Sequence, residues 1–183
     1  MTLIGGSSIM ISGAVGGILD IIKLSRDKLV VTYMNNDGGG VINTIVFKES
    51  GSASVKNGLI FADDPYAISM KRINDSHILV GYMDGSGVGE VILFNIASSG
   101  TVSSKKTLTI SNCHTLWCYL EKVTDNKYIF FYNSSSQSAT CAKLIYLYNI
   151  TASSPTMSFG ANTLGIKNPS TSSHMLTTRG YAV

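Results

Sequence analysis

The sequence predicts an all-β fold made of tandem four-stranded antiparallel repeats of about 50 residues. Three observations predict it. Tyr33, Tyr82 and Tyr132 each close a similar apolar run, at intervals of 49 and 50 residues. The runs are rich in β-branched and aromatic residues, which pleated strands favour. Gly, Asn, Asp and Ser separate the runs at regular distances, as the residues of tight turns do.

The first unit shows the expected order of elements. Its strands are predicted near residues 19–23, 28–33, 41–47 and 58–61, with a tight turn at 26–28 and a longer one at 35–40. Both faces of the second strand are apolar, which is typical of a strand buried between neighbouring sheets. The three prolines lie outside the apolar runs, as strand interiors require.

The repeats divide the single domain of residues 1–183 into units 18–66, 67–115 and 116–165 and a partial fourth unit, 166–183. Four antiparallel strands repeated every 40–50 residues are typical of propeller blades, so we expect a β-propeller-like partial ring. A β-trefoil, which also has three four-stranded units, is the alternative, although its usual Trp- or Leu-centred motif does not recur. Because rings need about four to eight blades, a homo-oligomer, or a continuation in another chain, is expected to complete this one.

One string recurs in all three units. It reads KLSRDKLVVTY, KRINDSHILVGY and KVTDNKYIFFY, and each copy leads into a Gly- or Ser-rich turn and a second strand. The string resembles repeats in β-propeller-like regions of phage tail-fibre and bacterial surface attachment proteins. The resemblance implies an attachment module on a virion or on an extracellular or cell surface.

Composition excludes several functions. Charged residues make up 14% of the chain and the net charge is +3, without the Lys and Arg stripe that nucleic-acid binding needs. The uncharged first 19 residues are too broken by Gly and Ser for a membrane span. Cys113, Cys118 and Cys141 are odd in number, so they cannot all pair within one chain.

No catalytic motif is present. The glycines at 85, 87 and 89 precede a predicted strand, whereas a phosphate-binding loop leads into a helix. The three histidines lie in unrelated places, so no catalytic residue is assigned. We expect no cofactor, apart from Ca²⁺ that Asp63, Asp64 and nearby carbonyl groups could hold.

Polar and aromatic residues gather on two kinds of connection, those between the second and third strands of a unit and those between successive units. In an up-and-down blade these connections emerge at the same end. Amide, carboxylate and aromatic groups together suit carbohydrate, through hydrogen bonds to hydroxyls and a flat apolar face for the sugar ring. The hypothesis is therefore a non-enzymatic module that binds a glycan or protein receptor. A polysaccharide hydrolase and a purely structural virion scaffold are the alternatives. The candidate ligand-binding residues are Asn35, Asn36, Asp37, Asp63, Asp64, Tyr66, Asp84, Asn112, His114, Trp117 and His174.

Overall fold

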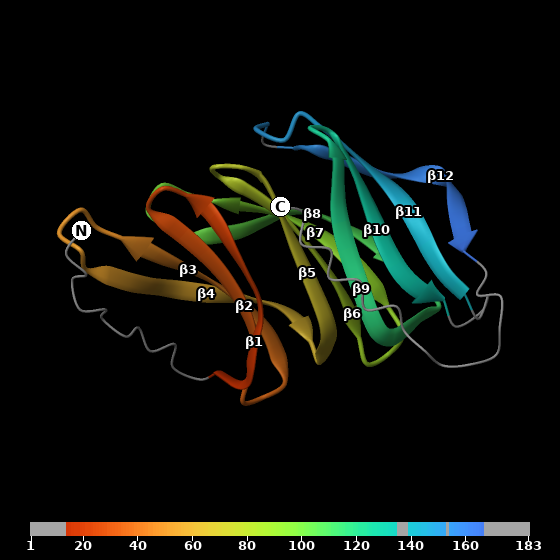
Figure 1. Ribbon diagram of the computed structural model, residues 1–183, viewed down its shortest axis with the longest axis horizontal. Helices are drawn as coiled ribbons and strands as arrows, with labels where there is room; N and C mark the ends of the chain where they lie inside the picture. Colours follow the sequence, from red (N-terminus) through yellow and green to blue (C-terminus); the bar gives the residue numbers. More distant parts are fainter. Residues whose placement is uncertain (1–13, 135–138, 153, 167–183) are drawn as a thin grey trace, which may run out of the picture.

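A computed structural model describes residues 14–134, 139–152 and 154–166, and these form three four-stranded antiparallel sheets (Figure 1). Sheet 1 contains β1 (Ala14–Ser25), β2 (Lys28–Asn35), β3 (Gly39–Phe47) and β4 (Ala53–Asp63). Sheet 2 contains β5 (Pro65–Asn74), β6 (His77–Asp84), β7 (Gly89–Ile96) and β8 (Val102–Ile110). Sheet 3 contains β9 (Cys113–Thr124), β10 (Lys127–Ser134), β11 (Ala139–Tyr148) and β12 (Thr156–Ile166).

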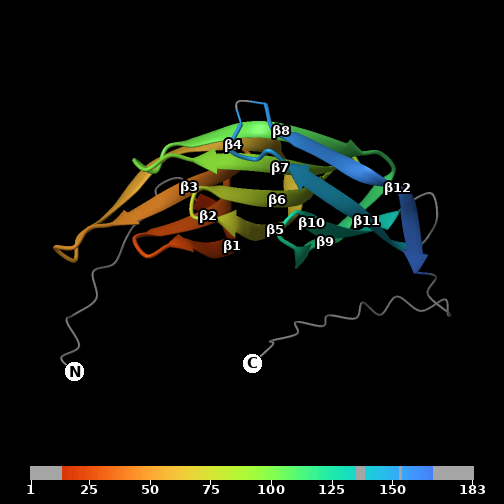
Figure 2. The same cartoon turned by 90° about the horizontal axis from the view of Figure 1, so that it is seen from above.

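Within each sheet the strands follow one another in chain order, so every sheet is an up-and-down meander. The sheets stand side by side with sheet 2 in the middle, and Figure 2 shows β1, β5 and β9 along one edge and β4, β8 and β12 along the other. The predicted all-β, propeller-like tandem architecture is confirmed. A trefoil distributes the strands of each unit between a barrel and a cap of hairpins, whereas here each unit forms one open sheet. Residues 167–183 of the expected fourth unit lie outside the described residues.

The outermost strand of sheet 1 is longer than predicted. The sequence placed it at 58–61, but β4 runs from Ala53 to Asp63. Its first half carries Ser54 and Lys56, which interrupt the apolar pattern. An edge strand has only one neighbour and needs little apolar surface, so hydrophobicity alone detects only its central part.

Two apolar layers hold the sheets together. Between sheets 1 and 2 lie Val30, Ile42, Val80 and Phe94, all buried. Between sheets 2 and 3 lie a second set of buried side chains, which includes Leu79, Leu93, Leu120, Phe130 and Ile145. Strand β6 is in the middle sheet and is buried on both faces, as its uninterrupted apolar sequence predicts.

Polar side chains also connect the edge strands β1, β5 and β9. The Met70 amide donates to Asp20 Oδ2 (2.7 Å), which joins β5 to β1. The Leu120 amide donates to Ser69 Oγ (3.1 Å), which joins β9 to β5. Asp20 and Ser69 are 49 residues apart and occupy the same place in their repeats. Burial raises the pKa of Asp20, although the amides of Met70 and Ile21 oppose the change by donating to its carboxylate.

The turns repeat as closely as the strands. In each sheet, the turn between the first and second strands accepts a hydrogen bond from the third strand. The donor is the amide of the last or next-to-last residue of that third strand. The three bonds are Phe47 N to Asp27 O (2.8 Å), Ile96 N to Ser76 O (2.7 Å) and Leu147 N to Asn126 O (2.9 Å). The recurrence shows that the three units share one backbone design despite few identical residues.

Candidate binding face

Four connections meet at one end of the sheets, and we call this end the loop face. They are the β2–β3 turn, the β4–β5 link at Asp64, the β6–β7 turn and the β8–β9 link at 111–112. The Asp64 amide donates to Gly38 O (2.9 Å), and the Cys113 amide donates to Gly87 O (2.8 Å). Each link between sheets is thus bonded to the turn of the preceding sheet, which gathers most of the candidate residues at this end.

Two of the candidates shape the turns themselves. Asn35 Oδ1 accepts hydrogen bonds from the amides of Asp37 (3.1 Å) and Gly39 (2.7 Å). Asp84 Oδ1 accepts from the amides of Ser86 (3.0 Å) and Val88 (2.8 Å), in the same pattern. Short Asn and Asp side chains commonly organise turns in this way, so these two oxygens already have partners.

The third repeat has an Asn one position earlier, since Asn133 pairs with Thr140 as Met83 pairs with Gly89. Asn133 lies 49 residues after Asp84, and its Oδ1 accepts a hydrogen bond from Thr140 Oγ1 (3.3 Å) across the pair β10–β11. The side-chain oxygens of Asn35, Asp84 and Asn133 thus all accept hydrogen bonds within the chain.

The links between sheets use a left-handed backbone. Asp64 has φ of 47° and Asn112 has φ of 61°, and they are 48 residues apart. Asn and Asp tolerate this conformation better than other residues with a side chain. The conformation reverses the chain within one or two residues and sends it from the last strand of one sheet into the first strand of the next.

The remaining candidates of this end present their side chains outward. Asn36, Asp37, Asp63, Asp64 and Tyr66 are all exposed. Tyr66 is 60% exposed, which is high for an aromatic ring. These five side chains are free of the turn-building role of Asn35 and Asp84.

A glycine lets Asp64 and Tyr66 approach the neighbouring turn. A Cβ atom on Gly85 would lie 2.8 Å from Asp64 Oδ2 and 3.0 Å from Tyr66 Cε2, closer than real side chains allow. The carboxylate and the ring therefore both lie against the β6–β7 turn. The result is a small surface with an aromatic face, a carboxylate and an exposed main chain.

Trp117 and the histidines differ from this group. In the pairing of β9 with β10, Cys118 faces Tyr132 and His114 faces Asn133, so residues 115–117 form a bulge. Trp117 is half-buried in this bulge. His114 belongs to β9 near the loop face, and Asn112 precedes it, whereas His174 lies outside the described residues.

Acidic groups set the electrostatics of the loop face. Burial raises the pKa of Tyr82, and the hydrogen bond that its hydroxyl donates to Glu90, together with the charges of Asp84 and Asp63, raises it further. The hydroxyl of Tyr82 therefore stays protonated at pH 7.

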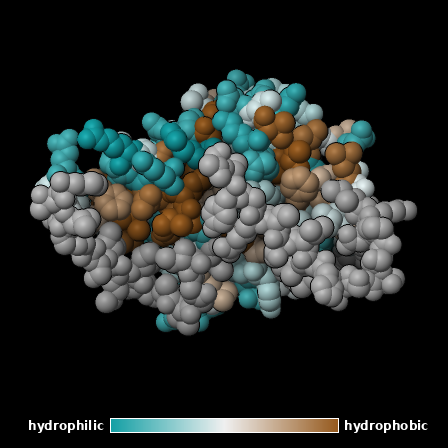
Figure 3. All heavy atoms as spheres, in the orientation of Figure 1, coloured by the Kyte–Doolittle hydropathy of each residue, from teal (hydrophilic) through white to brown (hydrophobic). Residues whose placement is uncertain are grey.

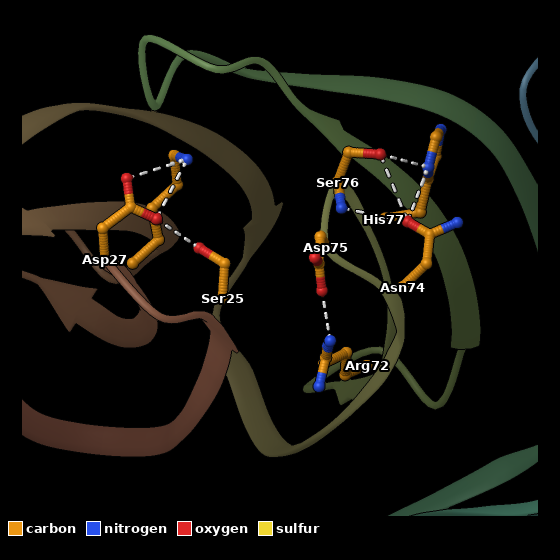
Figure 4. Close-up of polar contacts among 8 residues, drawn as sticks. Ser25, Asp27, Arg72, Asn74, Asp75, Ser76 and His77 are labelled. Carbon is orange, nitrogen blue, oxygen red and sulfur yellow. Dashed lines mark hydrogen bonds and ion pairs between the residues drawn. The ribbon is translucent and has the colours of Figure 1, made fainter.

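The opposite end carries the tight turns, shown in Figure 4. Asp27 accepts a hydrogen bond from Ser25 Oγ (2.6 Å), and an ion pair joins Arg72 to Asp75. Ser76 Oγ (3.0 Å) and Asn74 Oδ1 (3.1 Å) both contact Nδ1 of His77. These contacts fix the turns and are drawn between neighbouring residues of the chain.

The His77 cluster is not arranged for nucleophilic catalysis. In a catalytic triad the serine and the acid contact different ring nitrogens, so that the imidazole can accept the serine proton. Here Ser76 and Asn74 share Nδ1. Burial, and then the charge of Lys105, lower the pKa of His77, so its ring is neutral at pH 7.

Carboxylates with a raised pKa would favour a hydrolase, and Asp20 is such a group. It lies between sheets 1 and 2, where its oxygens accept hydrogen bonds from the amides of Ile21 (2.8 Å) and Met70 (2.7 Å). Both partners belong to the backbone, so Asp20 has a structural role.

Among the residues that the structure describes, no three His, Cys, Asp or Glu side chains are grouped so as to hold a metal ion. Cys113, Cys118 and Cys141 are buried and form no disulfide bond with one another. Burial raises the pKa of Cys113 to about 11, so its thiol is protonated and unreactive at pH 7.

No protein-family model matches the chain, and neither a curated protein nor a solved structure does. The class of protein is therefore defined by its architecture, an all-β chain of tandem, propeller-like four-stranded sheets. Within the described ranges there is no helix with the length and hydrophobicity needed to cross a membrane.

Proposed function

We propose that the chain is a non-enzymatic binding module of a phage tail or a surface appendage, exposed on a virion or cell surface, and that its loop face binds a glycan receptor. The observation that carries the proposal is the group formed by Tyr66, Asp64 and Gly85. An exposed aromatic ring lies beside a carboxylate and a glycine of the β6–β7 turn. The tail or surface setting comes from the resemblance of the three repeated strings alone.

The chemistry of this group suits a sugar. The faces of a pyranose ring are partly apolar and stack on aromatic rings, while two neighbouring hydroxyls can donate to one carboxylate. Gly85 lets the Asp64 carboxylate and the Tyr66 ring lie close to the main chain of the turn. Asp63, Asn36 and Asp37 are exposed at the same end of the sheets and offer further hydrogen-bond acceptors.

The structure changes the choice of test residues. Asp84 and Trp117 are obvious choices from the sequence, but Asp84 Oδ1 organises a turn and Trp117 is half-buried in a bulge. Changing either would alter the backbone together with any ligand contact. Tyr66→Ala and Asp64→Asn remove only exposed groups and are better probes.

A glycan array probed with the intact chain tests the proposal. Binding to at least one glycan is expected, with loss of at least about tenfold in affinity for Tyr66→Ala and Asp64→Asn. Tyr148→Ala is the matched control, because Tyr148 is also an exposed tyrosine but ends β11 at the opposite end of the sheets. Its binding should equal that of the unchanged chain.

Three results would contradict the proposal. Binding that survives both changes at Tyr66 and Asp64 would place the site elsewhere. Failure to bind any glycan, with capture of a purified surface protein instead, would make the receptor a protein. Turnover of a polysaccharide by the purified chain would make it a hydrolase.

A further inference from the structure

One cation of the chain is held by a carboxylate and a tyrosine ring together. Lys71 Nζ of β5 lies 3.0 Å from Glu121 Oε2 and 4.9 Å from the centre of the Tyr119 ring, both on β9. Lys71 Nζ also donates to the Tyr119 hydroxyl (3.3 Å), which donates in turn to Glu121 Oε2 (2.8 Å). The carboxylate attracts the ammonium group by its charge, and the ring attracts it by the negative potential of its face.

The loop face presents the same two kinds of group without a cation. Asp64 and Tyr66 are two positions apart, as Tyr119 and Glu121 are, and both are exposed. Asp64 Oδ2 and Tyr66 Cε2 lie within 3.0 Å of a single point, the place that a Cβ atom on Gly85 would take. None of the ion pairs of the described residues involves Asp64. The carboxylate and the ring are thus near enough for one ammonium group from outside the chain to contact both.

The charges around this pair favour a cation and oppose an anion. The four connections of the loop face, with the strand ends beside them, are residues 34–40, 62–66, 83–90 and 110–113, and these contain no Lys or Arg. They contain five carboxylates, those of Asp37, Asp63, Asp64, Asp84 and Glu90. An anionic sugar is therefore repelled at this end, whereas a sugar with an ammonium group is attracted.

Cations lie at the opposite end of the sheets instead. Lys23, Arg72 and Lys122 occupy the same place in the three repeats, beside the tight turns, and all three are exposed. Figure 3 shows hydrophilic residues gathered at the upper left of the molecule, over the β1–β2 and β3–β4 turns. Exposed polar surface is therefore present at both ends, and the two ends differ in the sign of the charges that have no partner.

We propose that the loop face selects a glycan that carries a free amino group, whose ammonium contacts the Asp64 carboxylate and the face of the Tyr66 ring. The inference rests on the proposed glycan binding and adds the class of sugar, an amino sugar whose nitrogen is not acetylated. An acetylated nitrogen has no charge, so such a sugar keeps its stacking on Tyr66 and loses the attraction to Asp64. Neutral glycans bind more weakly than glycans with a free amine, and anionic glycans more weakly still.

A matched pair of sugars tests the inference. One is the tetramer of glucosamine with four free amines, and the other is the same tetramer with all four amines acetylated. Both are titrated calorimetrically into the intact chain at pH 6, where a free amine is protonated, in about 0.15 M salt, which screens distant charges. The tetramer with free amines is expected to bind at least about tenfold more tightly.

Two variants locate the preference at the pair. Asp64→Asn removes the charge and keeps the size of the side chain, and Asn tolerates the left-handed backbone of this residue, whose φ is 47°. The two tetramers should bind Asp64→Asn with affinities within about twofold of each other. Tyr66→Phe keeps the ring and should keep the preference for the free amine.

Glu49→Gln is the matched control, because it removes the same charge from an exposed turn at the opposite end. Its preference should equal that of the unchanged chain, and circular dichroism establishes that each variant is folded. A loss of preference in Glu49→Gln equal to that in Asp64→Asn would overturn the inference, since the attraction would then be to the net charge of the chain.

The failure of this inference and the failure of the proposed function give different results. Equal affinity of the unchanged chain for the two tetramers, or array binding confined to glycans without a free amine, would overturn the inference and leave glycan binding in place. Absence of binding to both tetramers and to every glycan of the array would overturn both. Array binding of glycans with a free amine, but not of their acetylated counterparts, would support both.

Discussion

The contact of Gly81 with Phe130 offers a direct test of how sheets 2 and 3 pack. A Cβ atom on Gly81 would lie 2.6 Å from Phe130 Cε2 and 3.1 Å from Leu120 Cδ1. Carbon atoms in a protein core lie about 3.5–4.0 Å apart, so Gly81→Ala would have to displace a fully buried ring by about 1 Å. Sheet 1 has the buried Thr32 at the corresponding position, on the face that points towards sheet 2.

The expected magnitude follows from two opposing effects. Overpacking a core costs about 1–3 kcal/mol, while replacing Gly by Ala inside a strand gains about 0.5–1 kcal/mol from chain entropy. A net loss of about 1 kcal/mol in the free energy of unfolding is expected, which corresponds to a decrease of about 2–4 °C in Tm for a chain of this length. Urea unfolding followed by circular dichroism measures it.

A double-mutant cycle isolates the contact. Phe130→Leu alone should destabilise the chain, because it leaves a space between the sheets. The added methyl of Gly81→Ala fits that space, so the double variant should be more stable than additivity predicts by at least about 0.5 kcal/mol. Gly160→Ala is the control, since its nearest contacts are at 3.3 Å. Additive effects, or Gly81→Ala as stable as the unchanged chain, would refute the packing argument.

Three further predictions concern single residues. Asp20→Asn keeps an acceptor for the Met70 amide, whereas Asp20→Ala removes it and should cost about 1–2 kcal/mol at pH 7 in urea titrations. The pKa of Asp20 is raised in the folded chain, so the folded chain holds this proton more tightly than the unfolded chain does. The unchanged chain should therefore lose stability relative to Asp20→Asn as pH rises above 3.8. A constant difference in the free energy of unfolding between the two chains across pH 3–7 would contradict this. Gly38 has φ of 83° and open space around it, so Gly38→Ala should lower stability through backbone strain by about 1 kcal/mol, and Gly38→Asn by less, in thermal denaturation. Cys113 should resist a thiol reagent at pH 8 in the native chain and react at once in urea, because burial holds its pKa at about 11; equal rates would show that the thiol is accessible.

The strands could be predicted because the sequence repeats them. Tyr33, Tyr82 and Tyr132 fix the register of the second strand in each unit, and the turns beside them follow from Asn, Asp and Gly. The length of β4 could not be predicted, since its polar first half is held by hydrogen bonds to β3 and leaves no apolar pattern. The bulge at 115–117 was missed for a related reason, because extra residues inside one strand do not change its composition.

The candidate site could be predicted only as a region. The up-and-down order of the strands brings Asp64, Tyr66 and the β6–β7 turn to one end. It does not reveal which side-chain oxygens already accept hydrogen bonds from the turns. Asn35 and Asp84 have the same residue types as a ligand site, and only their distances to backbone amides identify their role in the turns. Asp20 and Ser69 were overlooked, although a polar residue recurring at 49 residues in apolar strands was a usable signal.

The meander order of the strands has a consequence for how the chain reaches its fold. Every strand pairs with a neighbour in sequence, so each ladder closes through a single short hairpin and no pairing waits for a distant segment. Folding is expected to be fast for an all-β chain, with each sheet forming as a local unit before the sheets dock. Because sheet 2 contacts both neighbours and sheet 3 only one, hydrogen exchange should be slowest in β6 and faster in β12, and the molecule should open from its ends.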